Sequence, residues 1–265
     1  MNEACWNPLV KQWIIVTEHR STRPWRQGKK QAMFKCPFCP SALELAYLEK
    51  WSIVSLLELG ICLVEGSLLV KLLELDAYSV IEAHGTCRVV EETPEYKGDL
   101  CTLSLDRITK VIDLCRNEYI KLFSLSYVEY VDTLRDRGNE IGVLVMHLHS
   151  QIHALLLVSL RVKAELESIK EYYGVAGKSL LYSIVGCELK KLEKVIYEND
   201  YYVVIAPLYA MWPYEVHVYL KKHFTSIAEV ISGALRYLTD ALRIVTAMYT
   251  ALLEAQELNK DASLS

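Results

Sequence analysis

Three histidines and one glutamine occupy every second position of the stretch MHLHSQIH, which covers residues 146–153. Successive side chains of an extended strand point to opposite faces, so His147, His149, Gln151 and His153 would share one face. A helix would scatter the same four residues around its axis, and the period of two therefore predicts a strand. The flanks IGVLV and ALLLVSL are apolar, which indicates a buried or half-buried sheet. Imidazole rings in such a place need partners, which a metal, a phosphate or a catalytic role could provide.

Other short runs of β-branched and aromatic residues predict further strands. WIIVTEH is followed by the basic turn RSTRPWR, and CRVVEE leads into a turn that contains Pro94. In the second half of the chain, the segments YENDYYVVIAPL and YEVHVYLKKH have the same character. We expect each of these segments to form a strand of a sheet.

Apolar residues at helical spacing predict three helices. The first covers residues 104–134 and begins at Ser104, in a Ser-Leu-Asp start that can cap it. A charged segment over residues 161–174 predicts a second helix, which ends at Gly174. The third is a long amphipathic helix within residues 226–259. Strand clusters that each precede a helix predict an α+β fold with antiparallel sheet and two related halves.

Composition and charge exclude several classes of protein. Of the 265 residues, 52% are hydrophobic and 23% charged, which excludes a disordered chain and allows one large domain or two small ones. The net charge of −4 provides no basic field for nucleic-acid phosphates. The charge-free run over residues 141–160 is long enough to span a membrane, but its three histidines and one glutamine argue against a lipid-facing helix. The opening MNEACWNPLVKQW shows no signal peptide, and we expect a cytoplasmic protein.

One pair among the eight cysteines has the spacing of a metal site. Without a secretion signal, we expect the thiols to be reduced. Cys36 and Cys39 in KCPFCP have the C-x-x-C spacing with which two thiolates can hold one tetrahedral metal ion. A redox pair, or a turn with two ordinary thiols, would have the same spacing. The residues alone therefore leave all three interpretations open.

Five blocks follow one another in a characteristic order. They are WNPLVKQWIIVTEHRSTRPW, CPFCP, GTCRVVEETPE, the pattern G-x-x-x-G-x-x-x-x-H-x-H-x-Q, and APLYAMWPYEVHVYLKKH. Together they resemble the galactose-1-phosphate uridylyltransferase family of the histidine-triad-like superfamily, over residues 6–253. The resemblance implies a histidine-triad-like antiparallel sheet with flanking helices. It further implies an N-terminal half over residues 1–173 and a C-terminal half over residues 174–265, with the second half incomplete.

The resemblance also implies an enzyme that moves UMP from UDP-glucose to galactose 1-phosphate through a uridylyl-histidine. By resemblance His149, the second histidine of the H-x-H pair, is the nucleophile, and Gln151 donates a hydrogen bond to a non-bridging phosphate oxygen. Arg20 and Arg23 match a basic turn near the substrate phosphates, with two solvated arginines as the alternative. The relatives are dimers with active sites across the interface, so we expect a homodimer with no nucleic-acid or membrane partner.

A structural zinc ion is the cofactor that the resemblance implies, with Cys36, Cys39 and His147 as ligands. A position that supplies a histidine ligand in several relatives is Tyr96 here, so the fourth ligand stays open. Glu165 has the spacing of a glutamate that binds a second metal in some members. A solvated helix glutamate is the favoured interpretation of that residue.

Several positions depart from the family pattern. Leu148 replaces the proline of an H-P-H triplet, Leu144 replaces a serine that helps to hold phosphate, and Asp136 replaces an asparagine. Residues 58–60 do not match the uridine-binding stretch, and the second histidine motif after the last helix is absent. Three hypotheses follow: a working uridylyltransferase, a weak or inactive member that binds nucleotide or a partner, and another nucleotidyltransferase or phosphorylase of the superfamily. We adopt the first as the predicted function.

Overall fold

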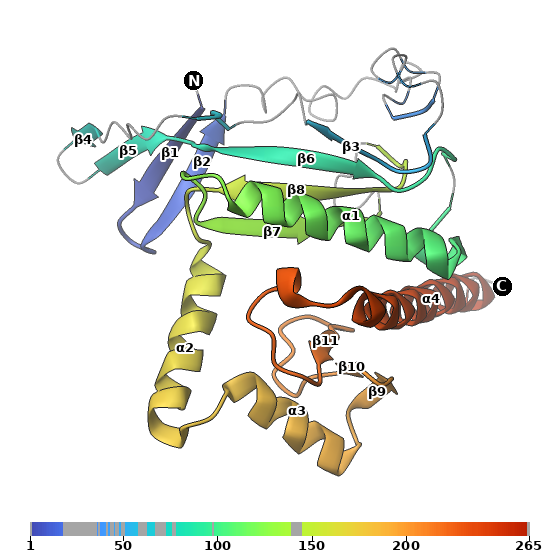
Figure 1. Cartoon of the computed structure of the whole chain (residues 1–265). Helices are drawn as coiled ribbons and strands as arrows, with labels where there is room; N and C mark the ends of the chain where they lie inside the picture. The colour runs from blue at the N-terminus through green and yellow to red at the C-terminus, as the bar shows by residue number, and fades with distance from the viewer. Residues whose placement is uncertain are drawn as a thin grey trace. The chain divides into compact units, whose positions relative to one another are not determined.

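The computed structural model describes residues 2–17, 36, 38–40, 42, 45, 48, 51–57, 63–66, 73–75, 78–96, 98–138 and 145–263. It divides into two compact units. Unit 1 comprises Met1–Lys97 and Leu114–Glu165, and unit 2 comprises Gly98–Asp113 and Leu166–Ser265. Each unit combines antiparallel strands with helices (Figure 1), which confirms the predicted α+β class.

Unit 1 contains two antiparallel sheets. One has the strand order β2-β1-β5-β4 and the other the order β3-β6-β8-β7. The predicted strands WIIVTEH and CRVVEE correspond to β2 and β6, and the histidine-rich strand corresponds to β8. The strands are β1 (Asn2–Asn7), β2 (Gln12–Thr17), β3 (Val54–Leu57), β4 (Leu73–Leu75), β5 (Tyr78–Glu82), β6 (Gly85–Glu91), β7 (Tyr130–Leu134) and β8 (His149–Leu155).

Buried and half-buried residues alternate along β8, as the sequence pattern predicts. The half-buried residues His149, Gln151 and His153 share one face of the sheet. The strand begins at His149, however, so the expectation that His147 belongs to the same row is wrong. His147 lies in a bend before the strand and is only 1% exposed, because it turns into the interior to contact the backbone of Thr93.

The two central strands of this sheet, β6 and β8, approach closely at Gly85. A Cβ atom at this position would lie 2.5 Å from the carbonyl oxygen of Ala154 and 2.9 Å from a methyl group of Leu63. Only glycine fits such a close approach of two backbones. Gly85 therefore helps to keep β6 in the register that places its other end beside His149.

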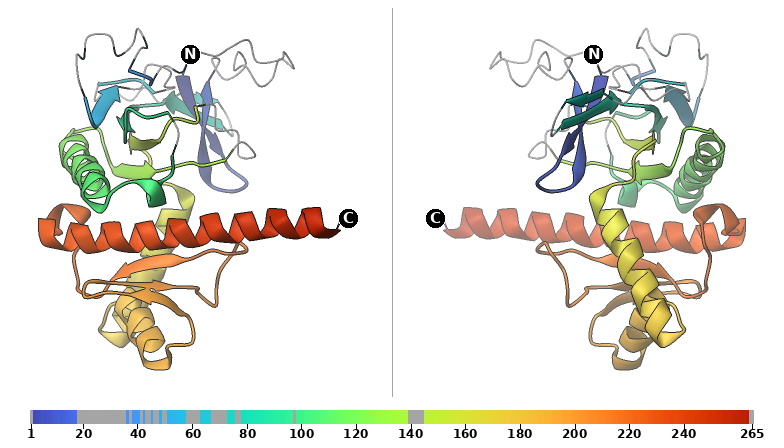
Figure 2. Two further views of the ribbon diagram at one scale, coloured as in Figure 1. Left: turned by 90° about the vertical axis from the view of Figure 1, so that its right-hand side faces the viewer. Right: turned by 90° about the vertical axis from the view of Figure 1, so that its left-hand side faces the viewer.

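Unit 2 is built around a smaller antiparallel sheet of order β11-β10-β9. All four residues of the central strand β10 are buried. Tyr202 and Val204 pack against α4, while Val203 and Ile205 pack against α3. The sheet therefore lies between two helices (Figure 2), and its elements are β9 (Val195–Glu198), β10 (Tyr202–Ile205), β11 (His217–Leu220), α3 (Leu180–Lys191) and α4 (Ser232–Ser263).

The first predicted helix is shorter than expected. Helix α1 covers Leu105–Phe123, and Ser104 caps it by accepting a hydrogen bond from the Arg107 N–H at 3.3 Å. The prediction that the helix continues to residue 134 is wrong, because Tyr130–Leu134 forms β7. The Ser124 hydroxyl donates to the Lys121 carbonyl at 2.7 Å and terminates the helix, and the following β-branched and aromatic residues pair with β8.

The second predicted helix ends later than expected. Helix α2 covers Leu160–Ala176, so Gly174 lies inside it and the prediction that it ends there is wrong. The termination is made by Gly177, which has a φ of +64° and donates its N–H to the Tyr173 carbonyl at 2.9 Å. Glycine adopts this left-handed conformation without a steric cost, which makes it the usual residue at a helix end.

Two short 3-10 helices are also present among the described residues, η4 (Leu100–Thr102) and η5 (Ile227–Glu229). The last predicted helix is confirmed, although η5 occupies its first residues and α4 starts at Ser232. Within the described part of the chain, no helix is both long enough and apolar enough to cross a membrane.

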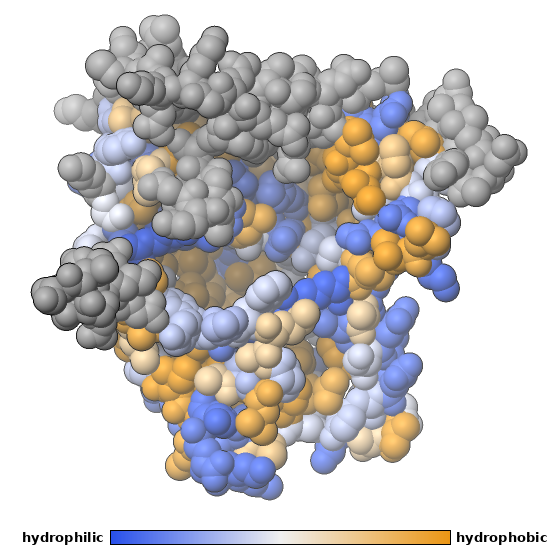
Figure 3. Space-filling model, turned by 180° about the vertical axis from the view of Figure 1, so that it is seen from behind, coloured by the Kyte–Doolittle hydropathy of each residue, from blue (hydrophilic) through white to orange (hydrophobic). Residues whose placement is uncertain are grey.

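Apolar side chains reach the surface at several places (Figure 3). Leu9 is 91% exposed in unit 1, and Leu208, Met211 and Trp212 are 76%, 71% and 67% exposed in unit 2. Exposed apolar residues are common on folded proteins. Their exposure alone does not identify a binding site.

Candidate functional site

Three predicted metal ligands come together in unit 1. The Nδ1 atom of His147 lies 3.7 Å from the sulfur of Cys36 and 3.9 Å from the sulfur of Cys39. All three ligand atoms lie within 4.8 Å of one another. Because His147 is 111 residues from Cys36 in sequence, the fold itself assembles this group.

The geometry of the three residues fits a tetrahedral metal such as zinc. With metal–sulfur and metal–nitrogen bonds of about 2.3 and 2.05 Å, a tetrahedral site separates sulfur from nitrogen by about 3.6 Å. The observed separations of 3.7 and 3.9 Å are close to this value. The Nε2 atom of His147 lies 2.6 Å from the Thr93 carbonyl oxygen, which can only accept a hydrogen bond. Nε2 therefore carries the proton, and Nδ1 directs its lone pair toward the two sulfurs.

Burial controls the protonation of these ligands. It lowers the pKa of His147, so the ring is neutral and able to bind a metal ion. It also raises the pKa of the Cys36 thiol to about 11. A cation bound here would displace the thiol proton, since thiolates are the form that binds metals.

The structure does not bring every candidate ligand to this group. Tyr96 is 45% exposed and meets the ring of His147 edge-on, with ring centroids 6.0 Å apart. Glu165 lies on α2, where its carboxylate accepts a hydrogen bond from Arg161 at 2.9 Å and is exposed to solvent. In the described residues, the ligand group consists of the two cysteines and His147.

His149 is held in the tautomer that a nucleophile requires. Its Nδ1 atom lies 2.7 Å from the backbone carbonyl oxygen of His147, so Nδ1 carries the proton and donates it. In the neutral ring, Nε2 then has a free lone pair. The ring is half-buried and lies 5.4 Å from the ring of Phe38, measured between centroids. The metal group and His149 are thus connected, because the residue that faces the two sulfurs also orients His149.

Gln151 lies two residues further along β8, on the same half-buried face as His149. Its side-chain amide has two N–H donors. A strand backbone holds the two side chains on one face about two residue lengths apart. This face can therefore present a nucleophilic nitrogen together with a hydrogen-bond donor.

A buried polar network supports the start of β8 from the opposite face of the sheet. The carboxylate of Glu92, which is fully buried, accepts hydrogen bonds from Arg135 Nε at 2.9 and 3.1 Å and from the Ser150 hydroxyl at 2.8 Å. The Glu92 N–H donates to the carbonyl of Leu148 at 3.0 Å. Leu148 itself is buried, so the leucine in the H-L-H triplet packs in the core.

The sequence patterns did not identify this network. The signal that could have found it is the pair of glutamates that follows CRVV. Adjacent residues of a strand point to opposite faces, so Glu91 and Glu92 cannot both reach solvent from a central strand covered on one side. At least one buried carboxyl with a specific partner was therefore predictable.

Some predicted site residues lie outside the described part of the chain. They are Arg20, Arg23, Leu144 and residues 58–60. Asp136 is described, and its side chain is exposed after the end of β7. Phosphate binding by the two arginines stays a prediction.

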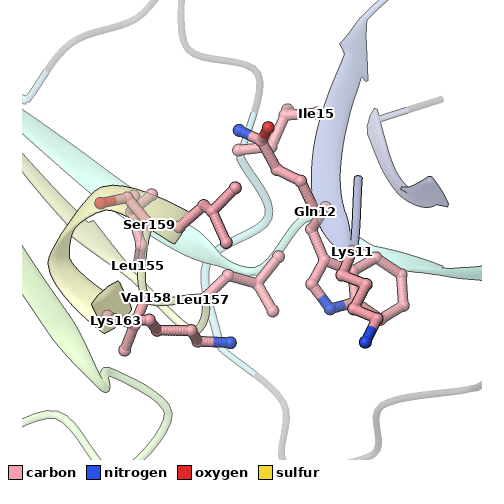
Figure 4. Close-up of a pocket in the computed structure, with 10 residues that line it drawn as sticks. Lys11, Gln12, Ile15, Leu155, Leu157, Val158, Ser159 and Lys163 are labelled. Carbon is pink, nitrogen blue, oxygen red and sulfur yellow. The ribbon is translucent and has the colours of Figure 1, made fainter. Parts of the chain in front are cut away.

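A pocket in unit 1 lies elsewhere than the histidine site. Its lining residues are Lys11, Gln12, Trp13 and Ile15 from the β1–β2 hairpin, and Leu155, Leu157, Val158, Ser159, Leu160 and Lys163. Figure 4 shows the side chains of Lys11 and Gln12 on one side, and those of Leu157 and Lys163 on the other. The metal group, His149 and Gln151 are not among its lining residues, so this pocket is separate from the candidate site.

Comparisons with known proteins agree on one family. Residues 71–158 match the N-terminal domain and residues 165–261 the C-terminal domain of "Galactose-1-phosphate uridyl transferase". The galactose-1-phosphate uridylyltransferase of Thermotoga maritima is 27% identical over 256 residues, which cover 97% of this chain and 78% of that protein.

Solved structures show the same likeness. A uridylyltransferase structure is 32% identical with a TM-score of 0.79, over 91% of this chain and 73% of that one. An ADP-glucose phosphorylase from Arabidopsis thaliana, solved with bound ADP-glucose, is 20% identical with a TM-score of 0.69, over 96% of this chain and 79% of that one. At that identity, the second likeness supports the fold alone.

Proposed function

This chain belongs to the galactose-1-phosphate uridylyltransferase family, and we propose that it moves a uridylyl group from UDP-glucose to galactose 1-phosphate through a covalent bond to His149. The observation that carries the proposal is the hydrogen bond from His149 Nδ1 to the His147 carbonyl, at 2.7 Å. It leaves Nε2 as a nucleophile on a half-buried face of the sheet.

The proposed reaction has two displacements. In the first, the lone pair of His149 Nε2 attacks the α-phosphorus of UDP-glucose, the N–P bond forms, and the bond to the departing glucose 1-phosphate oxygen breaks. In the second, a phosphate oxygen of galactose 1-phosphate attacks the same phosphorus, and the histidine is released with its lone pair restored. Gln151 would donate a hydrogen bond to a non-bridging oxygen as charge develops there in both transition states.

We assign the metal a structural role. Cys36, Cys39 and His147 would hold zinc, which supplies a fixed tetrahedral anchor for two thiolates and an imidazole. With His147 held, its backbone carbonyl stays in position to orient His149. The fourth ligand is left open in this assignment.

The remaining parts of the proposal come from the family likeness. Arg20 and Arg23 would pair with substrate phosphates, since the planar guanidinium group matches phosphate oxygens. Two copies of the chain would form a homodimer. Within each chain, residues 1–173 and 174–265 would be two related halves. A reducing compartment such as the cytoplasm is supported by the free thiols of the described cysteines.

Intact-mass spectrometry after mixing with UDP-glucose tests the proposal. We expect a mass gain of one uridylyl group on the native chain and none on His149→Gly. Release of the adduct by galactose 1-phosphate would establish the second displacement. A parallel incubation with ADP-glucose distinguishes another nucleotidyltransferase, which would gain an adenylyl group instead. A folded native chain that gains neither group would overturn the proposal in favour of an inactive family member.

A further inference from the structure

Glu91, at the end of β6, is a buried carboxyl group that the proposed chemistry has not yet used. Its side chain is fully buried, and neither carboxyl oxygen has a hydrogen-bond partner within the described part of the chain. Burying a polar group without a partner destabilises a fold. A residue of this kind is expected where a partner arrives later, for example with a substrate.

The register of the sheet places Glu91 next to the proposed nucleophile. Glu91 lies opposite His149 on β8 and opposite Val54 on β3. Side chains directly opposite each other in an antiparallel pair point to the same face, with Cβ atoms about 4.5–5.5 Å apart. Glu91 therefore shares the face of His149 and Gln151.

The neighbouring Glu92 shows what a satisfied buried carboxylate looks like in this sheet. It points to the opposite face, where Arg135 and Ser150 donate hydrogen bonds to it. Among the described residues, no cation or donor of this kind bonds to Glu91. The two adjacent glutamates therefore occupy different electrostatic environments.

Glu91 is uncharged at neutral pH. Burial, together with the negative charge of Glu92, raises the pKa of Glu91 to about 9. The groups that face it are His149 from β8 and the apolar Val54 from β3. A protonated carboxyl group is a hydrogen-bond donor and, unlike a carboxylate, does not repel phosphate.

We propose that Glu91, as a carboxylic acid, donates a hydrogen bond to a non-bridging oxygen of the phosphoryl group that forms its bond with His149. The inference rests on the proposed function and adds to it a second donor, which acts from β6 while Gln151 acts from β8. It accounts for a carboxyl group that is buried beside the nucleophile and has no hydrogen-bond partner among the described residues. No proton is transferred in this role, because the acid donates a hydrogen bond and keeps its proton.

Two substitutions separate the donor from the rest of the side chain. Glu91→Gln keeps the shape and an N–H donor, whereas Glu91→Met keeps the approximate volume and removes every donor. The measurement is the rate of uridylyl-His149 formation from UDP-glucose, followed by intact mass, with Glu167→Gln on the exposed face of α2 as the control. We expect Glu91→Met to slow the step by roughly a hundredfold, and Glu91→Gln to recover most of the rate. A native rate in Glu91→Met, or equal losses in both variants, would overturn the role of Glu91.

Thermal unfolding of the same variants shows whether a lost rate reflects a lost fold. Because the fold raises the pKa of Glu91, the stability linked to this group is complete below its ordinary value of 4.5 and is lost as pH rises to about 9. Glu91→Met lacks this loss and is expected to be at least as stable as the native chain at pH 7, with a smaller advantage at pH 5. If Glu91→Met does not fold, the rate of adduct formation is compared between the native chain and Glu91→Gln as a function of pH. The native rate should fall as Glu91 ionises, and the rate of Glu91→Gln should not; the same profile in both would overturn the role of Glu91.

The outcomes for Glu91 and for the proposed function are distinguishable. A native chain that forms no adduct overturns both. An adduct on the native chain that forms equally fast in Glu91→Met overturns the role of Glu91 and leaves the uridylyl transfer intact.

Discussion

The two units each place a histidine at the start of a strand, and the hydrogen bonds of the two rings differ. His149 opens β8 in unit 1, and one of its ring nitrogens bonds to the backbone while the other retains a lone pair. His217 opens β11 in unit 2, and both of its nitrogens are engaged, by Glu215 at 2.7 Å and by Tyr219 at 2.8 Å. Strand position alone therefore does not make a histidine a nucleophile. A histidine can act as a nucleophile only if its second ring nitrogen retains a lone pair.

The central strands of the two units also differ in the polar side chains that they bury. Strand β10 of unit 2 is buried through four residues that pack on helices from both sides. Strand β6 of unit 1 buries Thr86 and Glu91, and β8 buries Ser150 beside Glu92. Buried polar groups are expensive unless they are paired. The central strands of unit 1 thus give up apolar packing at several polar positions that can serve chemistry, whereas the only polar side-chain atom of β10 is the buried Tyr202 hydroxyl.

The largest expected effect is on the chemistry of the two histidines. We expect His149→Gln to reduce the rate of adduct formation from UDP-glucose by roughly 10⁴-fold or more, because no other group replaces the nucleophile. His217→Gln is expected to leave this half-reaction unchanged, since both nitrogens of His217 already have partners. The measurement is single-turnover intact mass, with circular dichroism as the control for folding. Equal losses in the two variants would contradict the contrast between the units.

A second large effect is expected from the buried ion pair of unit 1. Arg135 is 19% exposed and Glu92 is fully buried, so Arg135→Met would leave a buried carboxylate without its cation. The expected loss in the free energy of unfolding is about 3–5 kcal/mol, measured by denaturant titration.

A matched control for this pair exists on α2. Arg161 and Glu165 are separated by the same 2.9 Å but are 63% and 56% exposed. Arg161→Met should cost less than about 1 kcal/mol, because solvent screens an exposed pair. Similar losses in the two variants would show that the burial of Glu92 does not make the Arg135–Glu92 pair more stabilising than the exposed pair.

Metal removal is expected to affect unit 1 alone. We expect Cys36→Ser to abolish metal binding, as measured by elemental mass spectrometry, and to slow adduct formation by about 10–100-fold through the lost support of His147. Cys187→Ser changes an exposed thiol outside the ligand group and is the matched control. Hydrogen exchange should increase around the start of β8 and stay unchanged in β10. Full metal content in Cys36→Ser would exclude the assigned ligand set.

Elements with a strong local pattern could be predicted from the sequence. The period of two along β8 and the cap at Ser104 depend on neighbouring residues, and both are present in the structure. The end of α1 could not be predicted in the same way. Residues 130–134 continue the helical spacing, and they form β7 because a distant strand, β8, offers hydrogen bonds. The β-branched and aromatic residues of this segment favour a strand, but the remote partner that decides between helix and strand is not visible in the local pattern.

The site was predictable in its residues but not in its bonding. Family blocks identified Cys36, Cys39 and His147, and the fold brings the three together. The protonation of each histidine depends on backbone carbonyls, those of Thr93 and His147, which no side-chain pattern reveals. That Glu91 finds no hydrogen-bond partner in the described part of the chain likewise depends on what the fold places around it.

The smallest expected effect concerns the apolar packing of unit 2. Ile205 is fully buried in β10, so Ile205→Val would remove one methyl group and leave a small cavity against α3. We expect a loss of about 1 kcal/mol in the free energy of unfolding, measured by denaturant titration. Ile231→Val makes the same change at a side chain that is 57% exposed and should have almost no effect. Adduct formation at His149 should be native in both variants, because the strand contributes packing and no chemistry. A slower adduct in Ile205→Val would instead mean that the packed core of unit 2 helps to position the reacting groups of unit 1.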